Sequence, residues 1–190
     1  MKKQALRKLY LEKRLALSES EYNKLSGGIA DNFFNAIDLS SVQILHSFIP
    51  IQKNREPDTW QIIDRIQKEY PQVSISVPKI NNQTAMLDNF YFEDREQLEK
   101  NTWGIPEPRE GRPTPLEKIN IVLVPLLAVD STGHRVGYGR GFYDKFLNQC
   151  PPSILRVGLS FFPPVESIED VGQFDQPLTH LITPTQLFEF

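Results

Sequence analysis

Residues 42–77 read VQILHSFIPIQKNREPDTWQIIDRIQKEYPQVSISV, and this stretch decides the fold. Residues 42–49 form a short apolar run that a proline ends, as in a buried strand. Asp58 and Gln61 are placed to cap a helix whose apolar residues recur at helical spacing, namely Trp60, Ile63 and Ile66. A second strand is expected at residues 73–77. Strand, helix and strand in this order predict a βαβ unit, and therefore a parallel sheet with helices on its faces.

The rest of the chain supplies helices and strands on both sides of this unit. Before it, we expect an amphipathic helix at residues 2–16 and a second helix that starts at a capping box of Ser18 and Glu21 and ends near Ile37. After it, we expect a short helix at 142–149 and strands at 85–92, 119–124, 154–159 and 180–183. Residues 101–115 are rich in proline and contain two glycines, which predicts an irregular connection.

Length and composition predict a single α/β domain that spans residues 1–190. The 21 Lys and Arg residues against 24 Asp and Glu give a net charge of -3, which argues against binding to nucleic acid or to an acidic membrane. No apolar run approaches the ~18 residues that span a bilayer. Cys150 is the only cysteine. We therefore expect a cytoplasmic protein without disulfide bonds.

Alternating glycines lie between the strand expected at 119–124 and the helix expected at 142–149. They form the sequence GYGRG, with glycines at Gly137, Gly139 and Gly141. Glycines let backbone N–H groups approach an anion and a helix N-terminus adds partial positive charge, so the arrangement predicts a phosphate-binding loop. Arg135 and Arg140 can add full positive charge. A plain flexible turn is the alternative, and the loop lacks the G-x-x-x-x-G-K-[ST] pattern of a Walker-type P-loop.

Asp144 comes in the first turn of the helix that follows the glycine loop. An acidic residue there complements the helix dipole, and beside a polyphosphate it is also a natural Mg²⁺ ligand, so the residues leave both roles open. Several aromatic side chains either wall a flat ring system or belong to the core, namely Trp103, Tyr138, Phe142 and Tyr143. The three histidines show no metal-ligand spacing.

Two further groups of residues are candidates for a binding site. Lys3 and Arg7 lie one helical turn apart, with Arg14 two turns further along. Such a stripe is either a solvated surface or, if the helix docks near the glycine loop, a cationic clamp for phosphate. Ile51 and Glu56 follow the first strand of the βαβ unit, where open α/β sheets bind ligands, although Glu56 can equally be an exposed loop residue.

The segment VPLLAVDSTGHRVGYGRGFYDKFL at residues 124–147 resembles the signature of the 5-formyltetrahydrofolate cyclo-ligases, also called 5,10-methenyltetrahydrofolate synthetases. The resemblance extends over nearly the whole chain, through KQALR at 3–7, REPDT at 55–59, VPK at 77–79 and WGIPEP at 103–108. It implies a three-layer α/β/α sandwich with a mainly parallel central sheet, similar to ribose-phosphate isomerases and CoA transferases. It also implies ATP and 5-formyltetrahydrofolate as substrates, the latter with or without a polyglutamate tail. We expect the protein to be a monomer.

The resemblance also implies site residues. Catalysis is expected from Arg140, Lys3 and Arg7, and Mg²⁺ binding from Asp144. ATP is expected to contact the first helix and the glycine loop, at Lys3, Gln4, Ala5, Leu6, Arg7, Arg135, Val136, Gly137, Tyr138, Gly139, Arg140, Gly141, Phe142 and Tyr143. The folate is expected to contact Arg7, Ile51, Glu56, Tyr138, Gly139, Arg140, Gly141 and Phe142.

The implied reaction is the ATP-dependent closure of 5-formyltetrahydrofolate to 5,10-methenyltetrahydrofolate, through a phosphorylated formyl group (an iminium phosphate), with release of ADP and phosphate. Near the C-terminus the family shows a histidine-aspartate pair and a second aspartate, whereas this chain has Phe174, Asp175 and Thr179. The departure leaves open a folate- or nucleotide-binding protein without ligase activity. A sugar-phosphate isomerase or acyl-CoA transferase, with the glycine loop as a phosphate site alone, is a second alternative.

Overall fold

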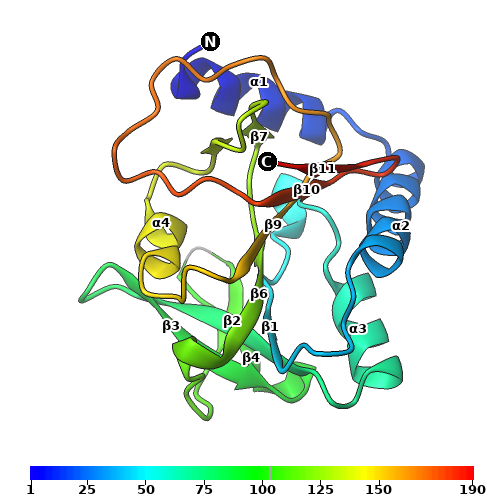
Figure 1. The fold of residues 1–190 in the computed structure, drawn as a ribbon, viewed down its shortest axis with the longest axis vertical. Helices are drawn as coiled ribbons and strands as arrows, with labels where there is room; N and C mark the ends of the chain where they lie inside the picture. Colours follow the sequence, from blue (N-terminus) through cyan, green and yellow to red (C-terminus); the bar gives the residue numbers. More distant parts are fainter. Residues whose placement is uncertain (103) are drawn as a thin grey trace.

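The computed structural model describes residues 1–102 and 104–190, so Trp103, an expected wall residue, lies outside the described residues. The chain folds around a seven-stranded sheet in the order β11-β10-β9-β6-β1-β2-β3 (Figure 1). The inner strands from β10 to β2 run parallel, and the edge strands β3 and β11 are antiparallel to their neighbours, which confirms the mainly parallel sheet. The strands are β1 Ile44–His46, β2 Ser74–Asn81, β3 Met86–Phe92, β6 Ile119–Val124, β9 Leu155–Leu159, β10 His180–Ile182 and β11 Leu187–Glu189.

The segment that decides the fold forms the expected βαβ unit. β1 pairs in parallel with β2, and helix α3, Trp60–Glu69, connects the two strands. One face of α3 is fully buried against the sheet, through Ile62, Ile63 and Ile66. The hydrophobic spacing therefore locates the helix correctly, because burial of this apolar face is the largest favourable contribution to its docking.

The start of α3 differs from the expected cap. The N-cap residue is Thr59, which has helical dihedral angles (φ -66°, ψ -13°) and makes no capping hydrogen bond through its side chain. Asp58 lies one residue further out. Its carboxylate accepts a hydrogen bond from the Trp60 backbone at 3.2 Å and another from the Gln61 side chain at 3.3 Å. The sequence pattern therefore identifies Asp58 and Gln61 correctly as residues of the helix N-terminus, but the N-cap lies one residue later than expected.

Helices cover both faces of the sheet, so the expected three-layer α/β/α architecture is confirmed (Figure 1). Helix α2, Glu19–Ala36, begins at the expected capping box and covers one face together with α3; α4, Phe142–Leu147, covers the other. Alternation along β6 divides the core between the two faces. Ile121 and Leu123 pack in the cluster of α2 and α3, whereas Val122 and Val124 pack in the cluster of α4.

Helix α1, Lys3–Leu15, lies across the top of the sheet in Figure 1, beside the short hairpin of β7 and β8. These two strands are Ala128–Val129 and Arg135–Val136. Leu6 and Tyr10 of α1 pack with Leu127 and Val136 in a small apolar cluster. This packing fixes the beginning of α1 next to the glycine loop, which follows β8 directly.

The structure contains short elements that the sequence patterns did not reveal. A two-stranded hairpin of β4, Leu98–Lys100, and β5, Pro106–Pro108, occupies part of the region expected to be irregular. Its short length agrees with the two prolines of β5, which lack the N–H that a longer ladder needs. The 3-10 turns are η1 Gln52–Asn54, η2 Arg95–Gln97 and η3 Leu116–Lys118. Among the described residues, no helix has both the length and the apolar character needed to cross a membrane.

Candidate active site

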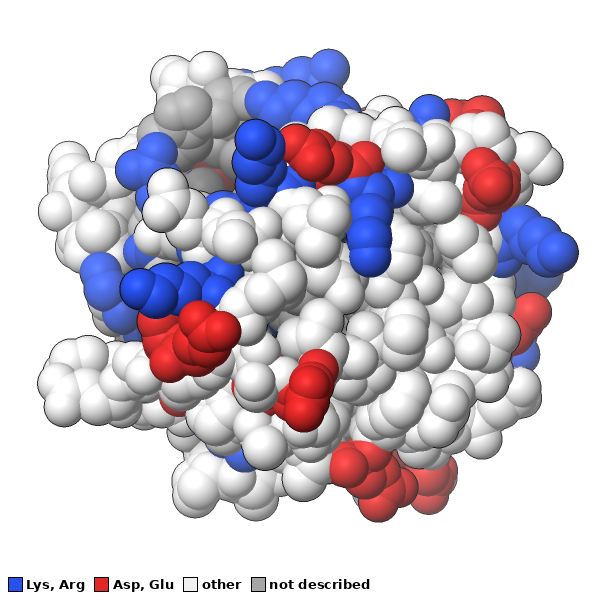
Figure 2. Space-filling model, turned by 90° about the horizontal axis from the view of Figure 1, so that it is seen from above, with Lys and Arg blue, Asp and Glu red and all other residues white. Residues whose placement is uncertain are grey.

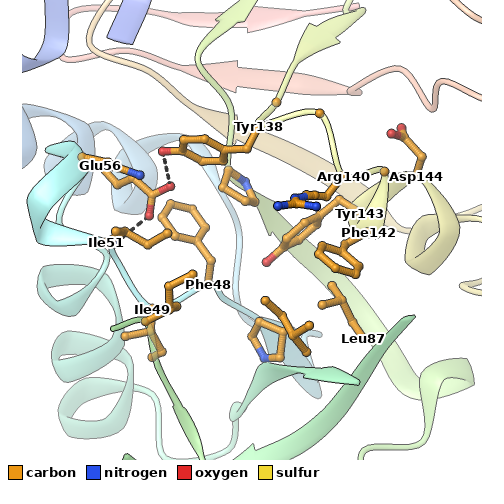
Figure 3. Close-up of a pocket in the computed structure, with 18 of the residues that line it drawn as sticks. Phe48, Ile49, Ile51, Glu56, Leu87, Tyr138, Arg140, Phe142, Tyr143 and Asp144 are labelled. Atoms are coloured by element: carbon orange, nitrogen blue, oxygen red, sulfur yellow. Dashed lines mark hydrogen bonds between the residues drawn. The ribbon is translucent and has the colours of Figure 1, made fainter. Parts of the chain in front are cut away.

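A pocket of about 790 Å³ opens at the carboxyl ends of β1 and β6. Its walls come from segments that are far apart in the sequence: the start of α1, the loop after β1, the hairpin of β2 and β3, β5, the glycine loop and α4 (Figure 3). This is the edge of the sheet at which open α/β folds bind ligands. The position of the pocket therefore follows from the parallel topology.

The glycine loop and α1 meet at one end of the pocket. Arg7 Nε donates a hydrogen bond to the Gly137 carbonyl at 2.9 Å. Gly139 has a φ of +88°, and a Cβ there would lie 3.2 Å from Arg7 Nη2, so a side chain would be strained and would crowd the guanidinium. Gly141, with a φ of +70°, is the N-cap residue of α4. The docking of α1 on which the cationic clamp depends is thus present.

Most charges at this end are paired. Lys3 Nζ donates to the Asp175 carboxylate, and Arg135 Nη2 donates to Asp144 Oδ1 at 2.8 Å. Arg140 is different, because it lines the pocket, is exposed and forms no hydrogen bond or ion pair with any described residue. Figure 2 shows that lysine and arginine side chains gather on the half of the upper face where α1 begins, interspersed with a few acidic groups. We call the part of the pocket that contains Lys3, Arg135, Arg140, Asp144 and Asp175 the charged end.

The opposite end is formed around a buried carboxylate. Glu56 is 2% exposed, and its two oxygens accept hydrogen bonds from Ile51 N and from the Tyr138 hydroxyl, each at 2.7 Å (Figure 3). Burial raises the pKa of Glu56, while these hydrogen bonds and the positive charge of Arg14 oppose the shift. The reading of Glu56 as an exposed loop residue is therefore wrong. We call this region the buried end.

Most residues singled out from the sequence lie in this one pocket. The lining includes Lys3, Arg7, Ile51, Glu56, Arg135, Gly137, Tyr138, Gly139, Arg140, Gly141, Phe142, Tyr143 and Asp144. Four residues named for ATP do not line it: Gln4 and Ala5 are exposed, whereas Leu6 and Val136 are buried in the cluster that docks α1. These four residues are close to lining residues in the sequence because they belong to the same helix and hairpin, but they do not face the pocket.

Other lining residues gave no signal in the sequence. Phe48, Leu87 and Pro106 bound the apolar part of the pocket, and they reach it through the β1 loop, β3 and β5. An apolar residue that faces a pocket looks like a core residue in a sequence, so no pattern could have separated the two. Asp175 also lines the pocket, as the partner of Lys3 at a separation of 172 residues.

The pocket offers Mg²⁺ one open carboxylate oxygen. Asp144 Oδ1 accepts hydrogen bonds from Arg135 and from Gln176 N, whereas Oδ2 accepts none from any described residue. No group of three His, Cys, Asp or Glu residues that could hold a metal occurs among the described residues. Because Mg²⁺ retains waters and takes phosphate oxygens when it binds with a nucleotide, one carboxylate is compatible with the ion but would not hold it alone.

Thr179, which replaces the second aspartate of the family pattern, has a structural role. Its Oγ1 accepts a hydrogen bond from Arg156 N at 2.9 Å and donates one to Arg156 O at 3.2 Å. These bonds join the segment before β10 to β9, and Thr179 does not line the pocket. The departure from the family pattern therefore leaves the described pocket wall intact.

Comparisons with known proteins agree with this geometry. The sequence model of the 5-formyltetrahydrofolate cyclo-ligase family matches residues 1–184. The 5-formyltetrahydrofolate cyclo-ligase of Mycoplasma genitalium is 28% identical over 160 residues, which cover 84% of each chain, and that of Mus musculus is 31% identical over 78% of this chain and 70% of its own. The NMR structure of Aquifex aeolicus 5,10-methenyltetrahydrofolate synthetase matches with a TM-score of 0.84 and 27% identity, over 100% of this chain and 93% of that chain. The chain therefore belongs to the 5-formyltetrahydrofolate cyclo-ligase family.

Proposed function

We propose that the pocket closes 5-formyltetrahydrofolate to 5,10-methenyltetrahydrofolate with ATP as co-substrate and releases ADP and phosphate. As a member of the cyclo-ligase family, the chain is an ATP-dependent ligase. The observation that carries the proposal is that a glycine loop with an unpaired arginine, Arg140, shares one cavity of about 790 Å³ with a buried carboxylate, Glu56. The charged end suits a triphosphate, and the buried end suits a flat heterocycle with N–H groups.

The chemistry requires both substrates in the same cavity. The N5-formyl group is an amide, and its oxygen is a poor leaving group. In the proposed sequence this oxygen attacks the γ-phosphorus, the bond from that phosphorus to the β-γ bridging oxygen breaks, and ADP leaves. N10 then adds to the activated carbon of the iminium phosphate and loses its proton, and phosphate leaves with the C–O bonding electrons. Most of the protein's contribution is positioning and charge stabilisation.

At the charged end, Arg140 is the cation best placed to follow the transferred phosphoryl group, because it forms no hydrogen bond or ion pair with any described residue. Lys3, Arg7 and the backbone of Gly137 to Gly141 hold the remaining phosphates. Arg135 acts mainly through Asp144, whose carboxylate it orients. Mg²⁺ bound beside Asp144 would neutralise phosphate charge.

At the buried end, Ile51, Glu56 and Tyr138 hold the folate ring. Phe142 and Tyr143 line the pocket on the side of Arg140 (Figure 3). Aromatic side chains at this point exclude bulk water from the activated phosphate, which limits wasteful ATP hydrolysis. The placement of Glu56 favours an acceptor role toward N–H groups of the pterin or of N10. A polyglutamate tail would leave through the open side of the pocket.

We further propose that residues 1–190 act as one domain, because the walls of the pocket come from segments spread from Lys3 to Asp175. We also propose that the protein acts as a monomer. A cytoplasmic location is proposed from the single cysteine, Cys150, which is buried and unpaired, as expected in a reducing compartment.

The direct test mixes purified protein with 5-formyltetrahydrofolate and Mg·ATP, and follows absorbance at the methenyl-folate band together with ADP. We expect both to rise in equal amounts, and neither to rise without ATP. If folate binds but no product forms, the chain is a binding protein that lacks ligase activity. If neither substrate binds, the proposal is wrong and the glycine loop is a phosphate site of another kind.

A further inference from the structure

Arg14 is a buried cation that the proposed reaction does not use. It lies on α1, two turns beyond Arg7, and it is 2% exposed. Its Nη1 donates to the Leu126 carbonyl at 3.1 Å, and its Nη2 donates to the Tyr138 hydroxyl. No described carboxylate forms a direct ion pair with it. A buried charge is costly unless it is compensated, so its compensation has to come through another group.

That group is the Tyr138 hydroxyl, which connects Arg14 to Glu56. A guanidinium can only donate hydrogen bonds, so the hydroxyl accepts from Arg14. The hydroxyl proton is then directed to Glu56 Oε1, at a distance of 2.7 Å. The order of donors is therefore fixed as Arg14 to Tyr138 to Glu56, with the positive charge at one end and the carboxylate at the other.

We call the chain of hydrogen bonds from Arg14 through the Tyr138 hydroxyl to Glu56 the relay. It joins four segments that are distant in the sequence. Arg14 comes from α1, Leu126 from the segment after β6, Tyr138 from the glycine loop and Glu56 from the loop after β1. The second Glu56 oxygen accepts from Ile51 N. Each carboxylate oxygen thus has one protein donor, and each retains a lone pair for a ligand. The carboxylate is held in one orientation while it remains able to accept from a bound ring.

We propose that Arg14 is a positioning residue that, through the Tyr138 hydroxyl, holds the Glu56 carboxylate at the pocket wall as an acceptor for N–H groups of the folate ring. The inference rests on the proposed function, in which Glu56 contacts the folate. The charge of Arg14 also opposes the effect of burial on the Glu56 pKa, which agrees with this role. Arg14 does not line the pocket, so it acts on the folate only through its partners.

The test is a double-mutant cycle with Arg14→Met and Tyr138→Phe. We expect each single variant to raise KM for 5-formyltetrahydrofolate about tenfold, as the loss of one hydrogen bond to a charged group predicts. KM for ATP should stay within about twofold, because Arg7 still contacts the glycine loop. The double variant should be little worse than either single variant, since both remove the same relay. Arg14→Lys should recover part of the loss, and Lys8→Met, exposed on the same helix, is the matched control.

Two other results would overturn the inference. If the effects on folate KM multiply in the double variant, Arg14 acts independently of Tyr138. If KM for both substrates rises together with a fall in thermal stability, Arg14 only docks α1. Should Arg14→Met fail to fold, Arg14→Lys replaces it in the cycle with Tyr138→Phe, with a smaller expected rise in folate KM. Glu56→Gln separates the role of Glu56 in folate binding from the relay. An unchanged folate KM in Glu56→Gln would contradict the role proposed for Glu56. A raised folate KM in Glu56→Gln, with no change in Arg14→Met, would contradict the relay alone.

Discussion

The two ends of the pocket hold their charges in opposite ways. At the charged end, Arg140 is exposed and has no ion-pair partner among the described residues, and Lys3 is bound to Asp175 at the pocket rim. At the buried end, Glu56 is 2% exposed and depends on Tyr138 for one of its two hydrogen bonds. Exposed charges are screened and contribute little to stability, whereas buried ones leave unsatisfied groups when a partner is removed. Substitution of an exposed charge such as Arg140 should therefore affect catalysis alone, whereas substitution of a group on which a buried charge depends should affect stability as well.

Arg140→Ala should have the largest effect on activity. We expect kcat/KM to fall about 10²–10³-fold, as when one pre-organised donor to developing charge is removed. The free energy of unfolding should change by less than about 0.5 kcal/mol, since the side chain is exposed and forms no hydrogen bond or ion pair with any described residue. Steady-state kinetics and urea unfolding measure the two quantities.

The matched control for Arg140 is Lys24→Ala, which removes an exposed cation from α2, outside the pocket. It should leave both quantities unchanged. Arg140→Lys should recover part of the activity, because lysine keeps the positive charge. The recovery should be incomplete, because an ammonium group is a point charge and lacks the planar guanidinium. A stability loss in Arg140→Ala comparable to its loss in activity would assign the arginine a structural role instead.

Asp144→Ala should lower activity and stability together, unlike Arg140→Ala. Arg135 is 7% exposed, and the carboxylate of Asp144 is its ion-pair partner at 2.8 Å. Removing that partner leaves a buried cation without an ion pair, which should cost about 1–3 kcal/mol in addition to the loss of turnover. Urea unfolding without nucleotide isolates the structural part.

Titration with Mg²⁺ then separates the two roles of Asp144. Asp144→Asn keeps an oxygen acceptor for Arg135 but removes the negative charge, so it should be more stable than Asp144→Ala. If Mg²⁺ binding depends on this carboxylate, both variants should need more Mg²⁺ at a fixed ATP concentration. An unchanged Mg²⁺ requirement in both would leave Asp144 with a structural role only, through its hydrogen bonds with Arg135 and Gln176 N.

Lys3→Ala should have a smaller effect, confined to nucleotide binding. We expect KM for ATP to rise about tenfold, with a stability change below about 1 kcal/mol, because the pair with Asp175 lies near the surface. The rise should shrink at high ionic strength, where the wild-type lysine is itself screened. Lys2→Ala removes the same charge from the neighbouring residue, which does not line the pocket, and should leave KM for ATP nearly unchanged.

The same contrast separates what sequence patterns predict from what they miss. Local patterns are reliable where neighbouring residues supply the physical cause: the capping box at Ser18, the apolar run of β6 and the glycine loop before α4 all lie as expected. The helix spacing also placed Lys3, Arg7 and Arg14 on one face. The spacing could not tell that this face is covered, because its cover comes from Gly137, Tyr138 and Asp175.

The parts that could not be predicted depend on contacts between distant segments. The hairpin of β7 and β8 is too short to show a periodic pattern, and β11 forms only by pairing with β10. The sequence around Glu56 gives no sign of burial, since one partner of its carboxylate is the backbone N–H of Ile51 and the other is the Tyr138 hydroxyl, which lies 82 residues further along the chain. Charged side chains are buried only when the tertiary structure provides partners, so a sequence shows the charge but not its environment.

Substitution of His46 should have the smallest effect on activity, because His46 lies on β1 and does not line the pocket. It is 0% exposed, and its Nε2 donates to Asn89 Oδ1 at 2.8 Å, since the Asn89 amide is itself engaged with the Leu87 carbonyl. Burial lowers the pKa of His46 to about 3. His46→Gln should therefore leave activity at neutral pH nearly unchanged.

The stability of the His46→Gln variant should nevertheless respond differently to acid. The native pKa of His46 lies below the ordinary value of 6.5, so between about pH 3 and pH 6.5 the unfolded chain binds a proton at His46 and the native protein does not. The contribution of His46 to stability is thus complete above pH 6.5 and is lost as the pH falls toward about 3, by up to about 1.4 kcal/mol per pH unit. Carboxylates titrate in both proteins, so the difference in urea unfolding between wild type and His46→Gln isolates the histidine. That difference should shift by about 2 kcal/mol between pH 6.5 and pH 5, and parallel curves would mean that His46 takes up a proton in the folded protein.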